Sequence, residues 1–271
     1  MMHKHLHTVL LVIMLATYSC AWGAELSHAQ LKDLFQQANE AFRQGNVESD
    51  PTQQTKHYQK AILTFEKIID QGQIKNPKLY YNLGNACLLN DQLGKAILNY
   101  CRAERLAKFN SDIHKNLAFA RSRRLDQVSI ETEKKVLQTL FFWHYDIPLA
   151  IRFTLGCIGV GITCITGVLI VLRDRQSIRF ISAGLFLVVS LALFASVVWE
   201  LKTLAQSAPG VITADSVMAR QGDGPNYPPS FKDPLHSGTE FELLEKRSAW
   251  LHIQLSDGSS GWIPDEAGDM I

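Results

Sequence analysis

The sequence is poor in cysteine and has almost no excess charge of either sign. Its 271 residues include 5 cysteines, 27 lysines and arginines, and 26 aspartates and glutamates, so the formal net charge is +1. Nucleic-acid binding needs a positive surface, and this balance gives no indication of one. Cys87 and Cys101 could pair in an oxidising compartment, but their spacing does not show that they are close. Cys157 and Cys164 share one face of an apolar run, so we expect them to pack as small apolar side chains.

The motifs of common enzyme classes are also missing. The sequence contains no glycine-rich phosphate loop, no paired metal-ligand motif, and no serine or cysteine nucleophile motif. The nine histidines are scattered, and we expect surface or packing roles for His57, His114, His144, His236 and His252. The sequence therefore predicts neither an enzyme nor a cofactor or metal site. Hydrolysis of an envelope substrate by the purified soluble parts, abolished by a single substitution, would overturn this prediction.

Long apolar runs, in contrast, are present. Phe153 to Leu172 and Phe180 to Trp199 each hold about 20 residues without a charge, the length with which a helix crosses the hydrocarbon core. The alternative, a buried helix pair in a soluble protein, would require an unusually large core. We therefore predict two transmembrane helices within residues 147–201, joined by the turn 173–179.

The joining turn sets the orientation of this hairpin. It contains three arginines, and short loops rich in lysine and arginine stay in the cytoplasm. Residues 25–146 and 202–271 should then both lie on the periplasmic or outer side of a bacterial inner membrane. Aromatic residues that suit the headgroup layer stand at that outer end: Phe141, Phe142, Trp143, Tyr145 and Trp199.

Small residues in the first run predict close packing of the two helices. They are Gly156, Gly159, Gly161, Thr163, Thr166 and Gly167, and we expect their face to contact Ser182, Ala183 and Gly184. Neither run contains an ionisable residue, so the pattern favours an anchor over a proton or ion path.

The N-terminus, residues 1–23, has the pattern of a secretory signal peptide. Lys4 precedes an apolar run from Val9 to Ala16, and small residues follow. Two cleavage sites fit, at 19–21 and at 21–23, and Cys20 leaves a lipid anchor as an alternative. Export agrees with the orientation that the arginine turn predicts.

Residues 25–125 show helical periodicity. Apolar residues recur at three- and four-residue spacing within the segments 31–42, 58–69, 80–87, 96–106 and 113–121. We expect the first helix to end at Gly45, and the polar segment 46–55, which contains Pro51, to form a loop. The second helix should stop near Gly72, and Gly94 should lie in a later turn.

These segments resemble tetratricopeptide (TPR) repeats. The best-matched unit is carried by Tyr80, Leu83, Gly84, Ala96, Tyr100 and Ala103, and a preceding unit by Phe35, Ala38, Phe42, Ala61, Phe65 and Ile68. A third, truncated unit begins at Leu117 and Ala118. The resemblance implies an all-α solenoid over residues 25–125, in which small residues let paired helices cross closely.

A TPR solenoid presents a groove lined by the first helix of each unit. The resemblance implies a partner-binding face made of Lys78, Tyr81, Asn82, Asn85, Leu88, Leu89, Lys115 and Phe119. Lysine and asparagine can hold a peptide backbone or a carboxylate, whereas the alternative is a solvated helix face. The family's carboxylate clamp has a fixed order of lysine and asparagine that this sequence does not reproduce.

Residues 126–146 form a charged, amphipathic connector between the helical segments and the first apolar run. We expect a helix that docks on the membrane surface. Its protection from proteolysis should disappear when detergent is added.

From residue 207 the pattern changes to short strands. Residues 211–219 predict one strand, and residues 221–226 predict a turn. The segment 207–271 resembles a bacterial SH3-type domain, an expected small all-β barrel, through Ala219, Arg220, Gly224, Pro225, Leu235, Gly238, Trp250, Leu255, Asp257, Gly258, Gly261, Trp262 and Ile263. Trp250 and Trp262 are either core residues or, with Tyr227, the lining of a groove for extended peptides or cell-wall peptide stems.

The order of these segments resembles the BatE type of aerotolerance-operon protein. The segments 79–85 (LYYNLGN) and 235–239 (LHSGT) carry the match best. The resemblance implies a multi-domain, non-enzymatic envelope scaffold, encoded with a MoxR-type ATPase and with membrane proteins that bear von Willebrand A domains and are its expected partners. A cell-wall sensor or tether, whose SH3-type domain binds peptidoglycan, is the alternative function.

Overall fold

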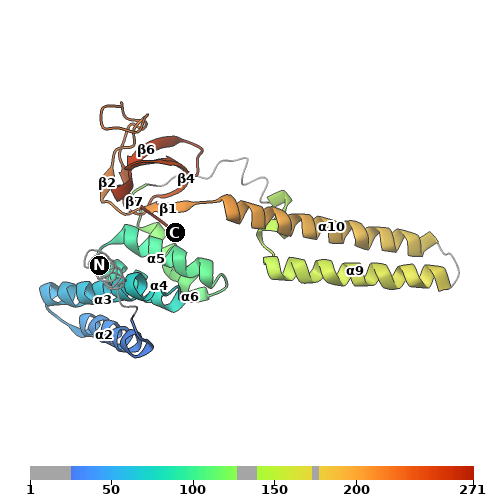
Figure 1. Ribbon diagram of the computed structural model, residues 1–271, viewed down its shortest axis with the longest axis horizontal. Coiled ribbons are helices and arrows are strands. Elements are labelled where there is room, and N and C mark those ends of the chain that lie inside the picture. Colours follow the sequence, from blue (N-terminus) through green and yellow to red (C-terminus); the bar gives the residue numbers. More distant parts are fainter. Residues whose placement is uncertain (1–25, 127–138, 173–176) are drawn as a thin grey trace, which may run out of the picture.

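The computed structural model describes residues 26–126, 139–172 and 177–271 of the chain. Its fold is mostly helical, with a small antiparallel sheet of five strands. Figure 1 shows a helical domain (28–122), a sheet domain (209–270) beside it, and an apolar hairpin (149–206) that projects away from both. The predicted signal peptide, most of the predicted connector and most of the arginine turn lie outside the described residues.

The helical domain begins with two antiparallel helices, α2 (His28–Val47) and α3 (Pro51–Gly72). The predicted loop at 46–55 is wrong, because only Asp50 and its two predecessors separate the helices. Pro51 begins α3 instead of breaking a helix, since its fixed φ and missing N–H suit the first turn. The Asp50 side chain caps α3 by accepting a backbone hydrogen bond of 2.9 Å.

The first helix also continues past Gly45, where the sequence predicted its end. Gly45 is buried against the ring of Tyr58, and a Cβ at this position would lie 2.6 Å from Tyr58 Cε1. The glycine therefore allows close approach of α2 and α3, which is a packing role. The predicted stop of the second helix near Gly72 is confirmed, with Gln73 in the left-handed region at φ 50°.

A second pair follows, α4 (Pro77–Leu89) and α5 (Leu93–Leu106), and α6 (Ser111–Ser122) packs on it. Gly84 lies at the crossing of α4 and α5, where a Cβ would come within 2.7 Å of the Tyr100 ring. This is the close crossing that the small residues predicted.

The turn between α4 and α5 differs from the prediction. Gly94 lies inside α5, and the left-handed residue of the turn is Asp91, at φ 56°. Aspartate tolerates this conformation better than most residues, because its short side chain can bond locally. Gly94 is needed for another contact, described below, in which the sheet domain approaches α5.

Small and large apolar side chains alternate in the core of the helical domain. Its fully or almost fully buried members include Ala38, Ala61, Phe65, Leu83, Ala96, Ile97 and Tyr100. Burying a side chain such as Phe65 contributes roughly 1.5–3 kcal/mol. Val211 of the sheet domain belongs to the same cluster, so the two domains share part of one core.

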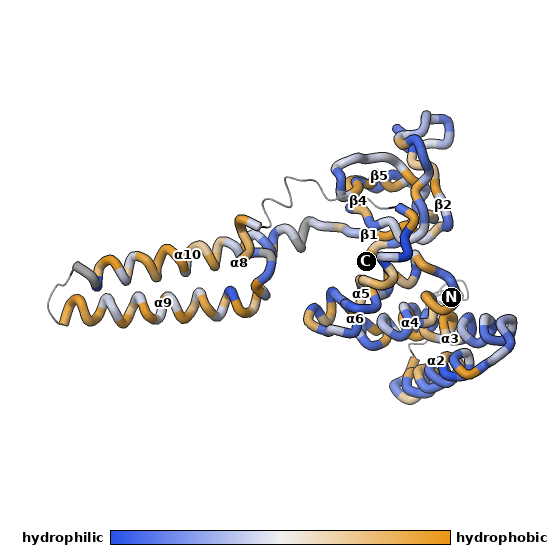
Figure 2. The backbone as a smooth tube through the Cα atoms, turned by 180° about the vertical axis from the view of Figure 1, so that it is seen from behind, coloured by the Kyte–Doolittle hydropathy of each residue, from blue (hydrophilic) through white to orange (hydrophobic). Residues whose placement is uncertain are grey.

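The apolar hairpin consists of α9 (Leu149–Leu172) and α10 (Ser177–Gln206), preceded by the short helix α8 (Phe142–Tyr145). Both long helices are long and apolar enough to cross a membrane. They pack against each other but leave most apolar side chains exposed. Figure 2 shows their apolar composition as two largely orange tubes. Such a surface suits lipid, because water would make its exposure costly.

The small residues of the first span meet a different part of the second span than predicted. Gly156 faces the ring of Phe194, and Gly159 faces Ser190 Oγ. The helices are antiparallel, so residues near the start of α9 lie opposite residues near the end of α10. Among the described residues no atom comes within 4 Å of a Cβ built on Gly161, Gly167 or Gly184, so the predicted contact with Ser182, Ala183 and Gly184 is not formed by these glycines.

The sheet domain is built on a five-stranded antiparallel sheet of order β6-β5-β4-β1-β7 and a two-stranded sheet of β2 and β3. The strands are β1 (Pro209–Ile212), β2 (Ser216–Val217), β3 (Leu235–His236), β4 (Glu240–Arg247), β5 (Trp250–Gln254), β6 (Ser260–Pro264) and β7 (Gly268–Met270), with the 3₁₀ helix η1 (Asp265–Ala267) before the last strand. The strand predicted at 211–219 is split, because β1 pairs with β4 and β7 whereas β2 pairs with β3. Residues 213–215 turn the chain between the two sheets.

Candidate functional site

The first candidate site is a row of amide side chains on α2, α4 and α6, which we call the asparagine row: Asn39, Asn82, Asn85 and Asn116. Asn82 Nδ2 donates to Asn39 Oδ1 at 3.0 Å, which joins α2 to α4. Asn116 Nδ2 donates to Asn85 Oδ1 at 2.9 Å, which joins α6 to α4. Three helices far apart in sequence therefore present one continuous polar strip.

Two tyrosines fix this strip from behind. The Tyr100 hydroxyl donates to Asn85 Oδ1 at 2.7 Å, and Asn116 also donates to the Tyr81 hydroxyl at 3.0 Å. The rings of Tyr81 and Tyr100 pack with centroids 6.0 Å apart. Burial raises the pKa of Tyr100, so its hydroxyl keeps its proton and remains available as a donor at neutral pH.

A pocket of about 290 Å³ lies beside the row at Asn82. It brings together three predicted site residues, Lys78, Tyr81 and Asn82, with residues of the α5–α6 turn. Lys78 is exposed at its rim. The pocket combines an ammonium group, a phenol ring and an amide, so it could hold a peptide segment through polar and apolar contacts.

The other predicted residues of this face occupy different places. Asn85 is in the row, but its Oδ1 is taken by Tyr100 and Asn116. Lys115 and Phe119 are exposed on α6 and do not line the pocket. Asn39 and Asn116 are not among the residues predicted for this face, although asparagine in the first helix of each unit was a signal that could have located them.

The second candidate site is the outer face of the sheet domain. Trp262 pairs across β5 and β6 with His252, and the two rings stack with centroids 4.8 Å apart and an interplanar angle of 9°. The Arg247 guanidinium lies 5.0 Å from the centre of the Trp262 ring. Trp262 is only 7% exposed.

The three residues predicted for a ligand groove therefore differ in exposure. Trp262 is covered, Trp250 is half-buried, and Tyr227 is exposed. The Tyr227 ring lies against Gly222, in a loop whose Asp223 is 3.7 Å from Arg247. Trp262 thus has a packing role, and only Trp250 and Tyr227 offer accessible ring surface.

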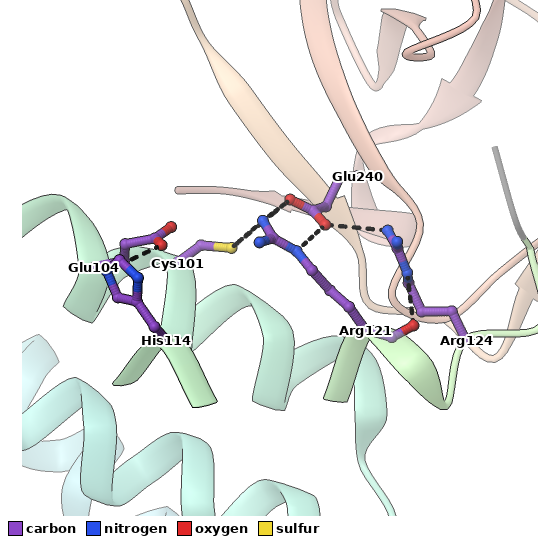
Figure 3. A network of polar contacts seen from close by, with 6 residues as sticks. All are labelled: Cys101, Glu104, His114, Arg121, Arg124 and Glu240. Atoms are coloured by element: carbon purple, nitrogen blue, oxygen red, sulfur yellow. Dashed lines mark hydrogen bonds and ion pairs between the residues drawn. The ribbon is translucent and has the colours of Figure 1, made fainter. Parts of the chain in front are cut away.

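A third feature joins the two domains, and Figure 3 shows its centre. Glu240, at the start of β4, accepts hydrogen bonds from Arg121 Nε at 2.8 Å and Arg121 Nη2 at 2.6 Å. Arg124 Nη1 donates to the same carboxylate at 3.1 Å. Burial opposes the charge of Arg121, but the bonds and the charge of Glu240 outweigh it and raise the pKa of Arg121. Arg121 therefore keeps its positive charge at neutral pH.

A second set of bonds surrounds Asp126. Its carboxylate accepts from the Thr239 hydroxyl at 2.6 Å and from His236 N at 2.6 Å, and it lies 2.8 Å from His236 Nδ1. Burial would raise the pKa of Asp126, but these bonds outweigh burial and lower it. Nearby, Gly94 N donates to Ser237 Oγ at 2.9 Å, and a side chain on Gly94 would collide with the backbone of β1.

This contact constrains the topology. The helical domain precedes the hairpin in sequence, and the sheet domain follows it. Because the two domains bond directly to each other, a hairpin that crosses a membrane must place both on the same side.

The mouth of the hairpin, next to α8, holds a polar cluster. Arg152 of α9 is 1% exposed and pairs with Glu200 of α10. Both residues directly flank the charge-free runs that the sequence predicted, so the helices are longer than those runs. Lys108 of the helical domain lies 3.2 Å from the other oxygen of Glu200. The cluster therefore connects the helical domain to the hairpin.

Neither metal-binding nor disulfide chemistry is present in the described residues. No group of three or more histidine, cysteine, aspartate or glutamate side chains could hold a metal ion among them. Cys87 and Cys101 are free and buried, so the possible disulfide between them is not formed. Burial, with a smaller effect of Glu240, raises the pKa of the Cys101 thiol to about 12.

Comparison with known proteins adds no assignment, because no family model matches the chain and no curated protein matches it either.

Proposed function

We propose that this protein is a membrane-anchored scaffold of the bacterial envelope that binds partner proteins along the asparagine row. The observation that carries the proposal is the row of amides that bonds α2 to α4 and α4 to α6, beside the pocket at Lys78. The amide atoms that are not used in bonds within the row can bond to the backbone of an extended peptide, whose own donors and acceptors repeat regularly. The paired helices with glycine at their crossing agree with the TPR resemblance.

The sheet domain acts in this proposal as a brace. Its SH3-type resemblance predicts a binding module, yet one of its surfaces is occupied by α5 and the end of α6. The sheet domain docks on α5 and the end of α6 and stiffens the helical domain there. The asparagine row stays open to a partner. The orientation, with both domains on the periplasmic side, follows from the arginine-rich turn in the sequence.

Partner identity follows from the BatE resemblance. We infer membrane proteins with von Willebrand A domains, held within one complex that serves stress tolerance. Anchoring and recognition are then the whole activity, and catalysis is left to other members of the complex.

Site-specific crosslinking in intact cells tests this proposal. A photoreactive residue at Lys78 should capture one defined membrane protein, identified by mass spectrometry. The matched control is the same probe at Lys67, an exposed lysine on α3 that does not line the pocket. Equal capture by both probes, or none from Lys78, would contradict the proposal.

A second candidate function uses the sheet domain as a tether to the cell wall. It is favoured by the accessible rings of Trp250 and Tyr227, which suit stacking on sugars or peptide stems. Purified full-length protein should then sediment with peptidoglycan sacculi, and Trp250→Ala should reduce the bound fraction. Sedimentation that is unchanged by Trp250→Ala would count against this site.

A further inference from the structure

One corner of the helical domain exposes apolar side chains beside the hairpin. In the turn between α5 and α6, Phe109 is 72% exposed, and Leu106 at the end of α5 is exposed as well. Exposure of such side chains to water is unfavourable, because their apolar surface stays unburied. We call Leu106, Lys108 and Phe109 the membrane-proximal corner.

The corner has a defined shape. Asn110 caps α6 by accepting hydrogen bonds from two backbone N–H groups of its first turn. His114 Nε2 lies 2.7 Å from the Lys108 carbonyl oxygen, and it lies 3.6 Å from Glu104 Oε1. Phe109 is therefore presented by a fixed turn.

Its position relative to the hairpin is fixed by Lys108. The ammonium group is 3.2 Å from Glu200 Oε1, and Glu200 directly follows Trp199, an exposed aromatic residue at the mouth of the hairpin. Figures 1 and 2 both show the α5–α6 end of the helical domain turned toward the hairpin. Phe109 is the next residue along the chain after Lys108, so the turn that carries it lies beside the mouth of the hairpin.

We propose that the membrane-proximal corner is a lipid-contact site, at which Phe109 and Leu106 enter the headgroup layer of the membrane that the hairpin crosses. The inference rests on the hairpin being a membrane anchor. It commits to lipid because Lys108 bonds to Glu200, which follows Trp199, and Trp199 lines one pocket with Phe141 and Trp143, aromatic residues of the kind that favour the interface. The ion pair with Glu200, which Arg152 shares, offsets part of the cost of placing the Lys108 ammonium group near the headgroup layer.

Lipid contact at the corner would give the helical domain an attachment to the membrane that is independent of the covalent connection through residues 127–138. The domain could then not rotate freely about the hairpin, and the pocket beside Lys78 would keep one height above the bilayer. A residue with a large apolar ring is required at position 109 for this role.

Photochemical labelling in vesicles tests the site. Full-length protein is reconstituted into vesicles of phosphatidylethanolamine and phosphatidylglycerol with benzoylphenylalanine at position 109. Lipid adducts are then detected by mass spectrometry. We expect adducts at 109, and also at Leu191, an exposed residue of α10 that reports the span itself. We expect none at Val47, which is exposed at the end of α2.

Each outcome decides the inference. Adducts at 191 without adducts at 109 would contradict lipid contact at the membrane-proximal corner, and they would still support the hairpin as a membrane anchor. Absence at both positions overturns the anchor and the corner together. A protein adduct at 109 in place of a lipid adduct also overturns the site, since it shows a contact between chains. With Lys108→Gln, the lipid adduct at 109 should decrease, while the adduct at 191 should not change.

Discussion

The helix pairs α4–α5 and α9–α10 cross closely in the same way, but the first is surrounded by protein and the second leaves its apolar surface exposed. Each is an antiparallel helix pair in which a glycine faces an aromatic ring, Gly84 against Tyr100 and Gly156 against Phe194. In the first pair, most remaining apolar side chains are buried by α3, α6 and the sheet domain. In the second, they remain exposed along both helices. Close crossing of two helices therefore depends on the residues at the crossing point. Whether the pair is surrounded by protein or by lipid is indicated by the side chains on the rest of its surface.

The largest expected difference between the pairs concerns apolar truncation. Phe65→Ala should lower the free energy of unfolding by about 3–5 kcal/mol, because it leaves a cavity in the core of the helical domain. Leu191→Ala, on the exposed surface of α10, should have little effect on unfolding in detergent. Thermal unfolding of both variants in the same micelles measures the difference. Similar losses would show that the hairpin surface is packed against protein.

The next effect compares glycines. Gly84→Val should destabilise the helical domain by about 1–3 kcal/mol, since its Cβ alone would lie 2.7 Å from the Tyr100 ring. Gly161→Val should be tolerated, because a Cβ there meets no described atom within 4 Å. The same unfolding assay applies. A stable Gly84→Val variant would contradict the close crossing of α4 and α5.

A third prediction concerns the surface by which α5 and α6 hold the sheet domain. Glu240→Gln should weaken this contact by about 2 kcal/mol, the scale of a lost hydrogen bond to a charged group. Hydrogen exchange should accelerate in β4 and at the end of α6. Glu266→Gln is the control, because Glu266 is an exposed carboxylate of the same domain. Equal exchange in the two variants would argue against the ion pairs with Arg121 and Arg124.

The smallest effect is a dependence on pH. The pKa of Asp126 is lowered from its ordinary value of 3.8, so its contribution to stability is complete at neutral pH and is lost as pH falls through the lowered pKa. Asp126→Asn should cost about 1 kcal/mol at pH 7. The difference from the natural chain should shrink below the ordinary pKa, as denaturant titrations at several pH values would show. A difference that stays constant down to the acid limit would contradict this assignment.

The sequence predicts the periodic parts of the fold well, for a physical reason. Helices with an apolar face and charge-free runs leave a signal every three or four residues or over a whole span. The two apolar helices were therefore found, although α9 begins four residues before the predicted run and α10 extends seven residues beyond it. The loop predicted around Pro51 and the turn predicted at Gly94 were wrong, because each residue type occurs in two structural roles. Proline begins helices as well as breaking them, and glycine permits close contact as well as turns.

The candidate site was less predictable. Lys78, Tyr81 and Asn82 share a pocket, since they lie within about one turn of a single helix, and their binding of a partner stays a prediction. Trp262 could not be assigned from its identity, because its exposure depends on Arg247 and His252 from other strands. The contact of Glu240 with Arg121 joins positions on either side of the hairpin, and no periodicity relates them.

The bond between Lys108 and Glu200 has a kinetic consequence. It holds the α5–α6 turn at the hairpin mouth, and that turn forms one wall of the pocket beside Lys78. A partner that is anchored in the same membrane would meet the pocket by lateral diffusion, within a layer only as thick as the domain. Confinement of this kind raises effective concentration, so recognition could be individually weak and still give a stable assembly. Partners without an anchor would encounter the same pocket far less often. Membrane anchoring would therefore select among partners before any of them contacts the pocket.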